Sequence, residues 1–202
     1  MGISQELASW SSPSYIETAT APRVGDEAPS DPKLVLAGKP TIIEFLRHCG
    51  CPELTWIIRL SLVAEATFLA MRTAATQNEF NFIAISHSDQ PSTEKWLSDV
   101  GGPGSVMLVN DAEREIYAKW GLGVVPWKHV LSPTALVNVW KLGKEQGIWN
   151  RPTESGSRWQ SSGHWAVDQE GYVRWGGPAA RADDVLDVTE AINALQRPRE
   201  RL

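Results

Sequence analysis

The stretch Thr41-Ile-Ile-Glu-Phe-Leu-Arg-His-Cys-Gly-Cys-Pro-Glu-Leu-Thr-Trp-Ile-Ile58 decides the fold. It opens with an apolar run of strand length, continues through the only two cysteines of the chain, and then becomes apolar at helical spacing. A proline suits the first turn of a helix, because its missing N–H would have no helical partner there. We therefore predict a strand over Thr41–Arg47, a turn that carries both cysteines, and a helix over Pro52–Gln77.

Cys51 falls between a predicted strand and a predicted helix, where a thiol becomes chemically useful. The partial positive charge of a helix N-terminus favours the thiolate over the thiol. Arg47 and His48 would add positive charge close to the thiols. We predict Cys51 and Cys49 as catalytic thiols, His48 as a catalytic neighbour and Arg47 as a substrate contact. Inert packing is the alternative for Cys51, since unpaired cysteine is often buried.

Glu44 lies inside the predicted strand, whose apolar residues on both alternating faces indicate a central strand covered on both sides. A buried carboxylate is costly unless it is paired or protonated. We predict Glu44 as a catalytic base near the thiols. A salt-bridged or edge-exposed glutamate is the alternative interpretation.

Three segments in order resemble one protein family: Val24-Gly-Asp-Glu-Ala-Pro29, the strand and thiol turn above, and Gly163-His-Trp-Ala-Val-Asp-Gln-Glu-Gly-Tyr-Val-Arg-Trp175. The family is the peroxiredoxin-like (alkyl hydroperoxide reductase/thiol-specific antioxidant) group of the thioredoxin-fold superfamily. The resemblance implies an α/β, thioredoxin-like fold: a central mixed β-sheet flanked by helices, with an N-terminal extension.

The thiol turn departs from a pattern that many relatives share. They carry Cys-Pro-x-Cys, and with Cys51 aligned on the first cysteine, Leu54 stands at the second. The resemblance therefore implies that Cys49, or an external thiol such as glutathione or thioredoxin, resolves the product formed on Cys51. Thioredoxins keep a buried acid behind their thiol as a proton relay, and Glu44 is the matching candidate here.

The remaining elements follow from periodicity and turn signals. We predict strands over 80–86, 105–110, 164–168 and 172–175, and helices starting at Ser92 and spanning 111–120, 134–145 and 182–196. The chain divides into an N-terminal arm over 1–23, a thioredoxin-like domain over 24–197 and a tail over 198–202.

Further substrate contacts are predicted on loops near the strand ends, where binding residues concentrate. In thioredoxin folds the loop before the late hairpin approaches the thiol, which points to residues around the start of that hairpin. The predicted substrate-binding residues besides Arg47 are His87, Trp127, Trp159, Ser162, Gly163 and His164.

Composition excludes several classes of function. The net charge of −5 argues against a nucleic-acid partner, which would need clustered Lys and Arg. No apolar run approaches the roughly 20 residues of a membrane span. Two cysteines and four scattered histidines do not suggest zinc. We expect a cytoplasmic protein without a bound cofactor or metal, and a homodimer by analogy with the family.

Three functions remain open at this stage. The first is a thiol-dependent oxidoreductase of peroxiredoxin-like type, acting on a small-molecule substrate and a thiol reductant. The second is a redox-independent biosynthetic enzyme that holds an aromatic or apolar small molecule in a tryptophan-lined pocket, because seven of the ten tryptophans lie from Trp120 onward. The third is a non-catalytic interaction module, since one fold supports many functions.

Overall fold

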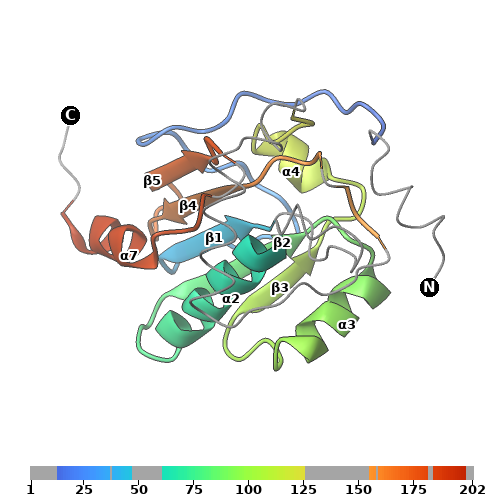
Figure 1. Cartoon of the computed structure of the whole chain (residues 1–202). Helices are drawn as coiled ribbons and strands as arrows, with labels where there is room; N and C mark the ends of the chain where they lie inside the picture. The colour runs from blue at the N-terminus through green and yellow to red at the C-terminus, as the bar shows by residue number, and fades with distance from the viewer. Residues whose placement is uncertain are drawn as a thin grey trace.

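The computed structural model describes residues 13–36, 38–46, 61–125, 155–157, 159–181 and 184–198. They form one five-stranded sheet in the order β3-β2-β1-β4-β5 (Figure 1). Its strands are β1 (Thr41–Phe45), β2 (Asn81–Ser86), β3 (Met107–Asn110), β4 (Gly163–Val167) and β5 (Val173–Pro178). The first three run parallel, while β4 is antiparallel to β1 and β5 is antiparallel to β4. This is the mixed sheet that the sequence predicted.

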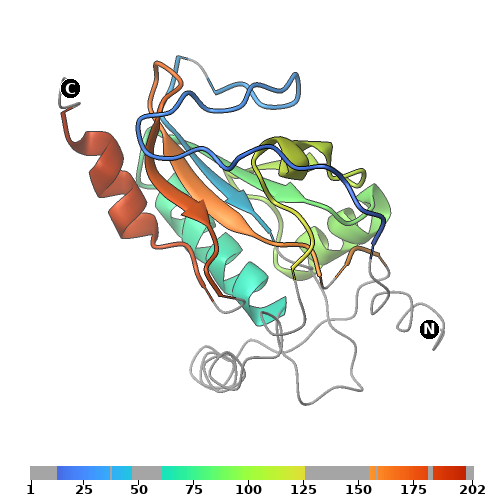
Figure 2. The ribbon, with the colours of Figure 1, turned by 90° about the horizontal axis from the view of Figure 1, so that it is seen from above.

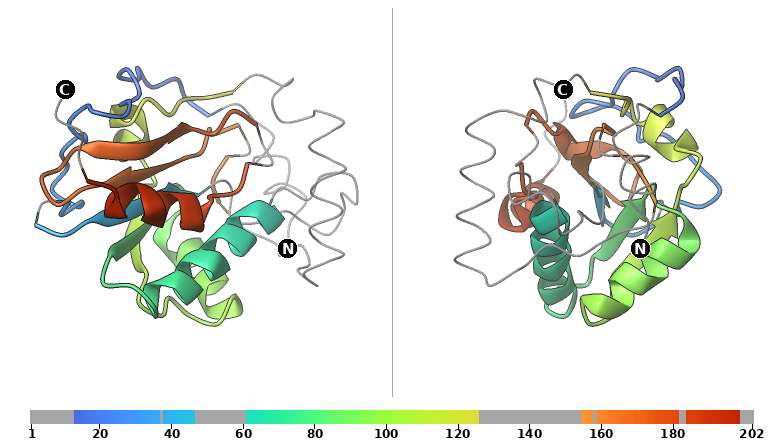
Figure 3. Two further views of the ribbon diagram at one scale, coloured as in Figure 1. Left: turned by 90° about the vertical axis from the view of Figure 1, so that its left-hand side faces the viewer. Right: turned by 45° about the vertical axis from the view of Figure 1, so that its right-hand side comes forward.

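Four helices accompany the sheet in the described residues: α2 (Ser61–Ala75), α3 (Gln90–Asp99), α4 (Glu115–Lys119) and α7 (Val188–Gln196). Seen from above, α2 and α7 lie on one side of the sheet, and α4 and the N-terminal segment lie on the other (Figure 2). Figure 3 shows α7 beside α2 on their shared face. The sheet is therefore the middle of three layers, as its apolar strands require.

Each face of the sheet has its own apolar core. On the α4 face the fully buried aromatic residues are Phe45, Tyr117, Trp120 and Trp165. On the α2 and α7 face the buried side chains include Ile42, Leu46, Phe68, Met71, Phe82, Trp96 and Ala166. Since neighbouring residues of a strand point to opposite faces, Glu44 of β1 lies on the α2 and α7 face.

Three predicted helix starts were wrong, and in two of these cases an aspartate caps the helix at a different place. Helix α3 begins before Ser92, because the Asp89 side chain accepts a hydrogen bond from the Ser92 N–H at 2.9 Å. Helix α7 begins at Val188, not 182, because Asp187 caps it by accepting from the Glu190 N–H at 2.9 Å.

Helix α4 is the third case: it begins at Glu115, not 111, after Arg114 in the left-handed conformation, and Asp111 binds its first turn from outside the helix. The Asp111 carboxylate reaches the backbone N–H groups of Glu115, Ile116 and Tyr117 at 2.8–3.1 Å. The strand bounds also differ from the predicted ones by one to three residues; for example, β3 begins at Met107, and β5 continues to Pro178.

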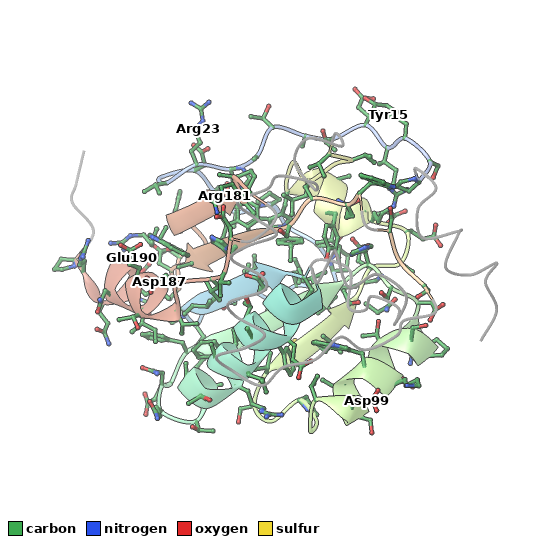
Figure 4. The ribbon with its side chains drawn as sticks, in the orientation of Figure 1. Tyr15, Arg23, Asp99, Arg181, Asp187 and Glu190 are labelled. Atoms are coloured by element: carbon green, nitrogen blue, oxygen red, sulfur yellow. The ribbon has the colours of Figure 1, made fainter. Side chains whose placement is uncertain are left out.

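The described N-terminal segment, residues 13–36, runs along the molecule and is called the strap below. Its backbone bonds to the body at several points, including Ala19 N–H to the Ala118 carbonyl oxygen and Gly25 N–H to that of Val173, both at 2.9 Å. The Trp165 indole N–H donates to the Pro22 carbonyl oxygen at 3.1 Å. Tyr15 and Arg23 point away from the body (Figure 4). The predicted division of the chain at residues 23 and 24 stays a prediction.

The pairing of β4 with β5 requires a glycine at one position. Gly176 has a φ of +104°, and a Cβ placed there would lie 2.0 Å from the His164 carbonyl oxygen. Gly177 beside it has no heavy atom within 4 Å of the place where a Cβ would lie, and it needs no positive φ. Strand β5 therefore approaches the His164 backbone closely at one residue and leaves room at the next.

We predict that Gly176→Ala lowers the free energy of unfolding by about 1–3 kcal/mol from backbone strain alone, with the steric overlap adding to the loss. Urea unfolding measures this change, and Gly177→Ala is the matched control, expected to change stability by under about 1 kcal/mol. Equal effects of the two substitutions would contradict the close approach of β5 to His164.

Candidate active site at the carboxyl edge of the sheet

The carboxyl ends of β1, β2 and β3 meet at one edge of the sheet, and β4 begins at the same edge, where Gly163 pairs with Phe45. Ligand sites of open α/β sheets lie outside the carboxyl ends of strands. Cys49 and Cys51 follow the end of β1 by four and six residues. The predicted roles of these cysteines, and of Arg47, His48 and Trp127, fall outside the described residues and stay predictions.

Glu44 and His164 are brought together by the register of the sheet. They are direct partners across the antiparallel β1–β4 pair, so both side chains lie on the α2 and α7 face. The His164 Nδ1 atom lies 3.6 Å from Glu44 Oε2, which is an ion-pair distance. The side chain of His164 is 15% exposed and that of Glu44 is 6% exposed. Glu44 Oε2 accepts no hydrogen bond within the described part of the chain.

The electrostatics of this pair follow from burial and proximity. Burial raises the pKa of Glu44 above its ordinary 4.5, although His164 opposes the shift. Burial lowers the pKa of His164, but the neighbouring Glu44 and the charge of Asp184 outweigh burial and raise that pKa above 6.5. Both groups therefore hold a proton more tightly than their unfolded counterparts do.

Trp175 of β5 fixes the imidazole from the other side. The two rings stack with centroids 5.3 Å apart and planes 18° apart. The indole N–H of Trp175 donates to Glu190 Oε2 at 3.1 Å, and Glu190 lies at the start of α7 (Figure 4). A protonated His164 would also gain a cation–π contact with the indole face.

His87 directly follows β2 and is buried at this edge, with 4% exposure. Its ring Nε2 lies 3.2 Å from the Ser157 backbone nitrogen and 3.0 Å from the Ser157 carbonyl oxygen. Only one of these contacts is a hydrogen bond in a given tautomer of the imidazole. The ring ties the 155–157 segment to the end of β2, and its predicted substrate contact stays untested.

Tyr117 of α4 anchors the ends of two strands. Its hydroxyl lies 2.6 Å from the Leu46 carbonyl oxygen and 2.8 Å from that of Ile85, and it donates its one proton to them. The ring also packs edge-on against Phe45 and His87. This buried hydroxyl fixes the last described residue before the segment that carries the cysteines.

The loop before β4 is bound into the body. The Ser161 N–H donates to the Gly123 carbonyl oxygen at 2.8 Å, and the Ser162 carbonyl oxygen accepts from the Ala179 N–H at 2.9 Å. A Cβ at Gly163 would lie 2.7 Å from the Trp165 ring, so packing explains that glycine. Ser162 and Gly163 lie at the predicted edge, and their contact with a substrate stays a prediction.

Four of the five described tryptophans fill the core, and the fifth, Trp175, is half-buried. Trp159, predicted to contact substrate, is 3% exposed, and Trp96, Trp120 and Trp165 are equally enclosed at 0–3%. Aromatic side chains of this kind dominate core packing. The described part of the chain therefore gives the predicted tryptophan-lined ligand pocket no support.

Sequence reasoning named Glu44 and His164 separately, but it did not pair them, and it missed Trp175, Asp184, Glu190 and Tyr117 as supporting groups. Val173 and Trp175 are two residues apart, a spacing that predicts the same face of a strand. A bulge puts them on opposite faces, because Val173 pairs with Val167 whereas Trp175 pairs with Ala166. The register that sets Glu44 against His164 joins residues 120 positions apart, and no local pattern in the sequence fixes it.

The arrangement is that of a thioredoxin-like fold, as comparison with solved structures confirms. A peroxiredoxin-like protein from Aquifex aeolicus superposes with a TM-score of 0.56 and 13% identity, over 90% of this chain and 91% of that one. A thiol peroxidase from Chromobacterium violaceum superposes with a TM-score of 0.54 and 18% identity, over 90% and 91% of the two chains. At these identities the likeness establishes the fold.

No protein-family model matches the chain, and no curated protein matches it in sequence. Within the described ranges, no helix is long and apolar enough to cross a membrane. The same ranges contain no cluster of three or more His, Cys, Asp or Glu residues that would hold a metal ion.

We predict that the Glu44–His164 pair makes stability depend on pH. Because both folded-state pKa values are raised, the stabilisation is complete below about pH 4.5 for Glu44 and pH 6.5 for His164. It is lost as the pH rises through each raised value. Urea unfolding of the wild type between pH 6 and 9 should show this decline, and Glu44→Gln should remove the part due to His164.

Glu79→Gln is the control for this measurement, because Glu79 is exposed on the turn after α2. It should keep the wild-type dependence on pH. An unchanged pH dependence in Glu44→Gln would show that the two side chains do not interact in the folded protein.

Proposed function

We propose that the chain is a thiol-dependent oxidoreductase in which Cys51 is the nucleophile and Cys49 or an external thiol is the resolving group. The observation that carries the proposal is the buried carboxyl of Glu44 on the central strand, directly before the segment with both cysteines. Strongly perturbed carboxyl groups that lie close to a strand end are candidates for proton transfer.

The length of chain between the end of β1 and the cysteines supports this proposal. Cys49 follows Leu46 by three residues and Cys51 by five, so their Cα atoms lie within about 11 Å and about 18 Å of that of Leu46. The Tyr117 hydroxyl fixes the Leu46 carbonyl oxygen at 2.6 Å, so the strand end before the cysteines has a defined position. Glu44 is therefore a candidate to accept the thiol proton, directly or through water.

The proposed reaction balances for a disulfide substrate. Glu44 takes the proton of the Cys51 thiol, and the thiolate attacks one sulfur of the substrate, breaking its S–S bond and releasing one thiolate. Attack on the Cys51 sulfur by Cys49 or an external thiolate then releases the second thiolate. The substrate gains two electrons, and the two attacking thiols lose them as they form a disulfide.

A hydroperoxide would react at the same thiolate. The sulfur attacks the terminal peroxide oxygen, the O–O bond breaks, and the alkoxide leaves and takes up a proton as the alcohol. The Cys51 sulfenic acid then condenses with Cys49 or an external thiol, which gives a disulfide and water. Glutathione and thioredoxin are candidate reductants for that disulfide.

We predict that the Cys51 thiol has an apparent pKa well below the reference value of about 8.5. The rate of alkylation by iodoacetamide between pH 4 and 10 measures it, with Cys51→Ser and Cys49→Ser beside the wild type. The low-pKa reaction should disappear in Cys51→Ser and persist in Cys49→Ser. A slow thiol with an ordinary pKa in the wild type would contradict the proposed function.

A further inference from the structure

The first part of the strap, residues 13–23, lies in a groove that is shaped for an extended chain, and we call it the leading strap. None of its residues belongs to a helix or a strand. Two glycines of the body make room for it. A Cβ at Gly121, whose φ is +75°, would lie 2.5 Å from the Ala21 backbone nitrogen. A Cβ at Gly123 would lie 3.2 Å from Thr18 Cγ2.

Three polar groups of the body hold the leading strap in place. The Arg114 guanidinium donates to the Ser14 carbonyl oxygen at 2.8 Å and to the Ser14 hydroxyl at 3.1 Å. The Trp165 indole N–H donates to the Pro22 carbonyl oxygen at 3.1 Å, and the Ala118 carbonyl oxygen accepts a backbone N–H of the leading strap. The strap groove, which therefore binds mostly main-chain groups, is made of Arg114, Ala118, Gly121, Gly123 and Trp165.

The leading strap buries little of its own surface. Pro22 is its one buried residue, whereas the groove beneath it belongs to the core, with Trp165 fully buried and Arg114 9% exposed. A segment with few buried contacts separates from the body at a lower free energy than global unfolding. Separation would take these partners from the Trp165 N–H and the Arg114 guanidinium, and unpaired buried donors are costly. The strap groove therefore requires an extended chain as its occupant.

The turn from Arg23 to Asp26 joins the leading strap to a part of the chain that is bonded to the sheet. The Asp26 carboxylate accepts from the Arg23 N–H at 2.8 Å, and the Asp26 N–H donates to the Arg23 carbonyl oxygen at 3.0 Å. The backbones of Gly25 and Asp26 bond to Val173 of β5. The leading strap can therefore change direction at Arg23 and Val24 while the sheet keeps its bonds to the chain that follows.

We propose that a second copy of this chain fills the strap groove, so that two chains exchange their leading straps by opening the turn at Arg23. A cleft of about 270 Å³ beside the turn, lined by residues 20–24 and 176–178, leaves space for the crossing chains. Arg23 points outward from the surface there (Figure 4). This inference goes beyond the proposed function and does not involve the cysteines.

The fit of this sequence to the groove favours a second copy as the occupant. The close approaches at Gly121 and Gly123 admit a small residue and a short side chain, which Ala21 and Thr18 supply. A second copy carries the same residues at the same spacing, so every contact of the strap groove forms again after the exchange. The two states therefore differ mainly in the turn, which is closed in the single chain and open in the exchanged pair.

The test compares Asp26→Ala with the wild type and with Glu27→Ala, using light scattering to measure the mass over a range of protein concentrations. Asp26→Ala removes the carboxylate that closes the turn of the single chain, and it removes nothing from the exchanged pair. A hydrogen bond of this kind contributes about fivefold per chain, so two opened turns should strengthen pairing about 25-fold. Glu27→Ala removes the same charge outside the bonds of the turn and should pair as the wild type does.

An equilibrated mixture of ¹³C-labelled and unlabelled chains locates the contact by NMR. An isotope-filtered NOE should join the Thr18 methyl group of one chain to Gly123 of the other, because a Cβ at Gly123 would lie 3.2 Å from that methyl carbon. This cross-chain NOE, together with stronger pairing of Asp26→Ala than of Glu27→Ala, supports the proposal. A single-chain mass for both the wild type and Asp26→Ala, a dimer without the cross-chain NOE, or equal pairing of the two variants each overturns it.

Discussion

The structure depends on placing a carboxyl group in the middle of a sheet that is covered on both faces. Glu44 lies on the central strand, where its side chain is 6% exposed and has His164 as its ionic partner among the described residues. Removing one member of such a pair is strongly destabilising, whereas replacing both by apolar residues is often neutral or stabilising. Packing alone thus gives no advantage to an ionisable pair here, which is why we propose a chemical use for Glu44.

The surrounding elements give this pair a rigid frame. The strap packs over the α4 face, where the Trp165 indole binds the Pro22 carbonyl oxygen at 3.1 Å. On the opposite face, α7 reaches the pair through Glu190 and Trp175. The Tyr117 hydroxyl fixes the end of β1. The two outer layers therefore fix the frame around Glu44 and His164.

Much of this frame could be predicted from the sequence, because strand β1 and its neighbour β2 are apolar runs whose burial follows from composition. Helix starts could not, since Asp89 and Asp187 cap their helices through side-chain bonds that compete with equally plausible caps nearby. Glu44 was predicted from its awkward place in an apolar strand. Its pairing with His164 could not be predicted, because the register of strands distant in sequence is decided by packing of the whole sheet.

The most direct test of proton exchange between the buried pair and the thiol is the titration of the Glu44 side-chain carboxyl by ¹³C NMR, in the wild type and in Cys51→Ser. A thiolate close to Glu44 disfavours its ionisation, and coupled groups affect each other reciprocally. We predict that Glu44 titrates at a lower pH in Cys51→Ser than in the wild type. Identical titration curves would contradict the account, because they would show that the buried carboxyl and the thiol do not interact.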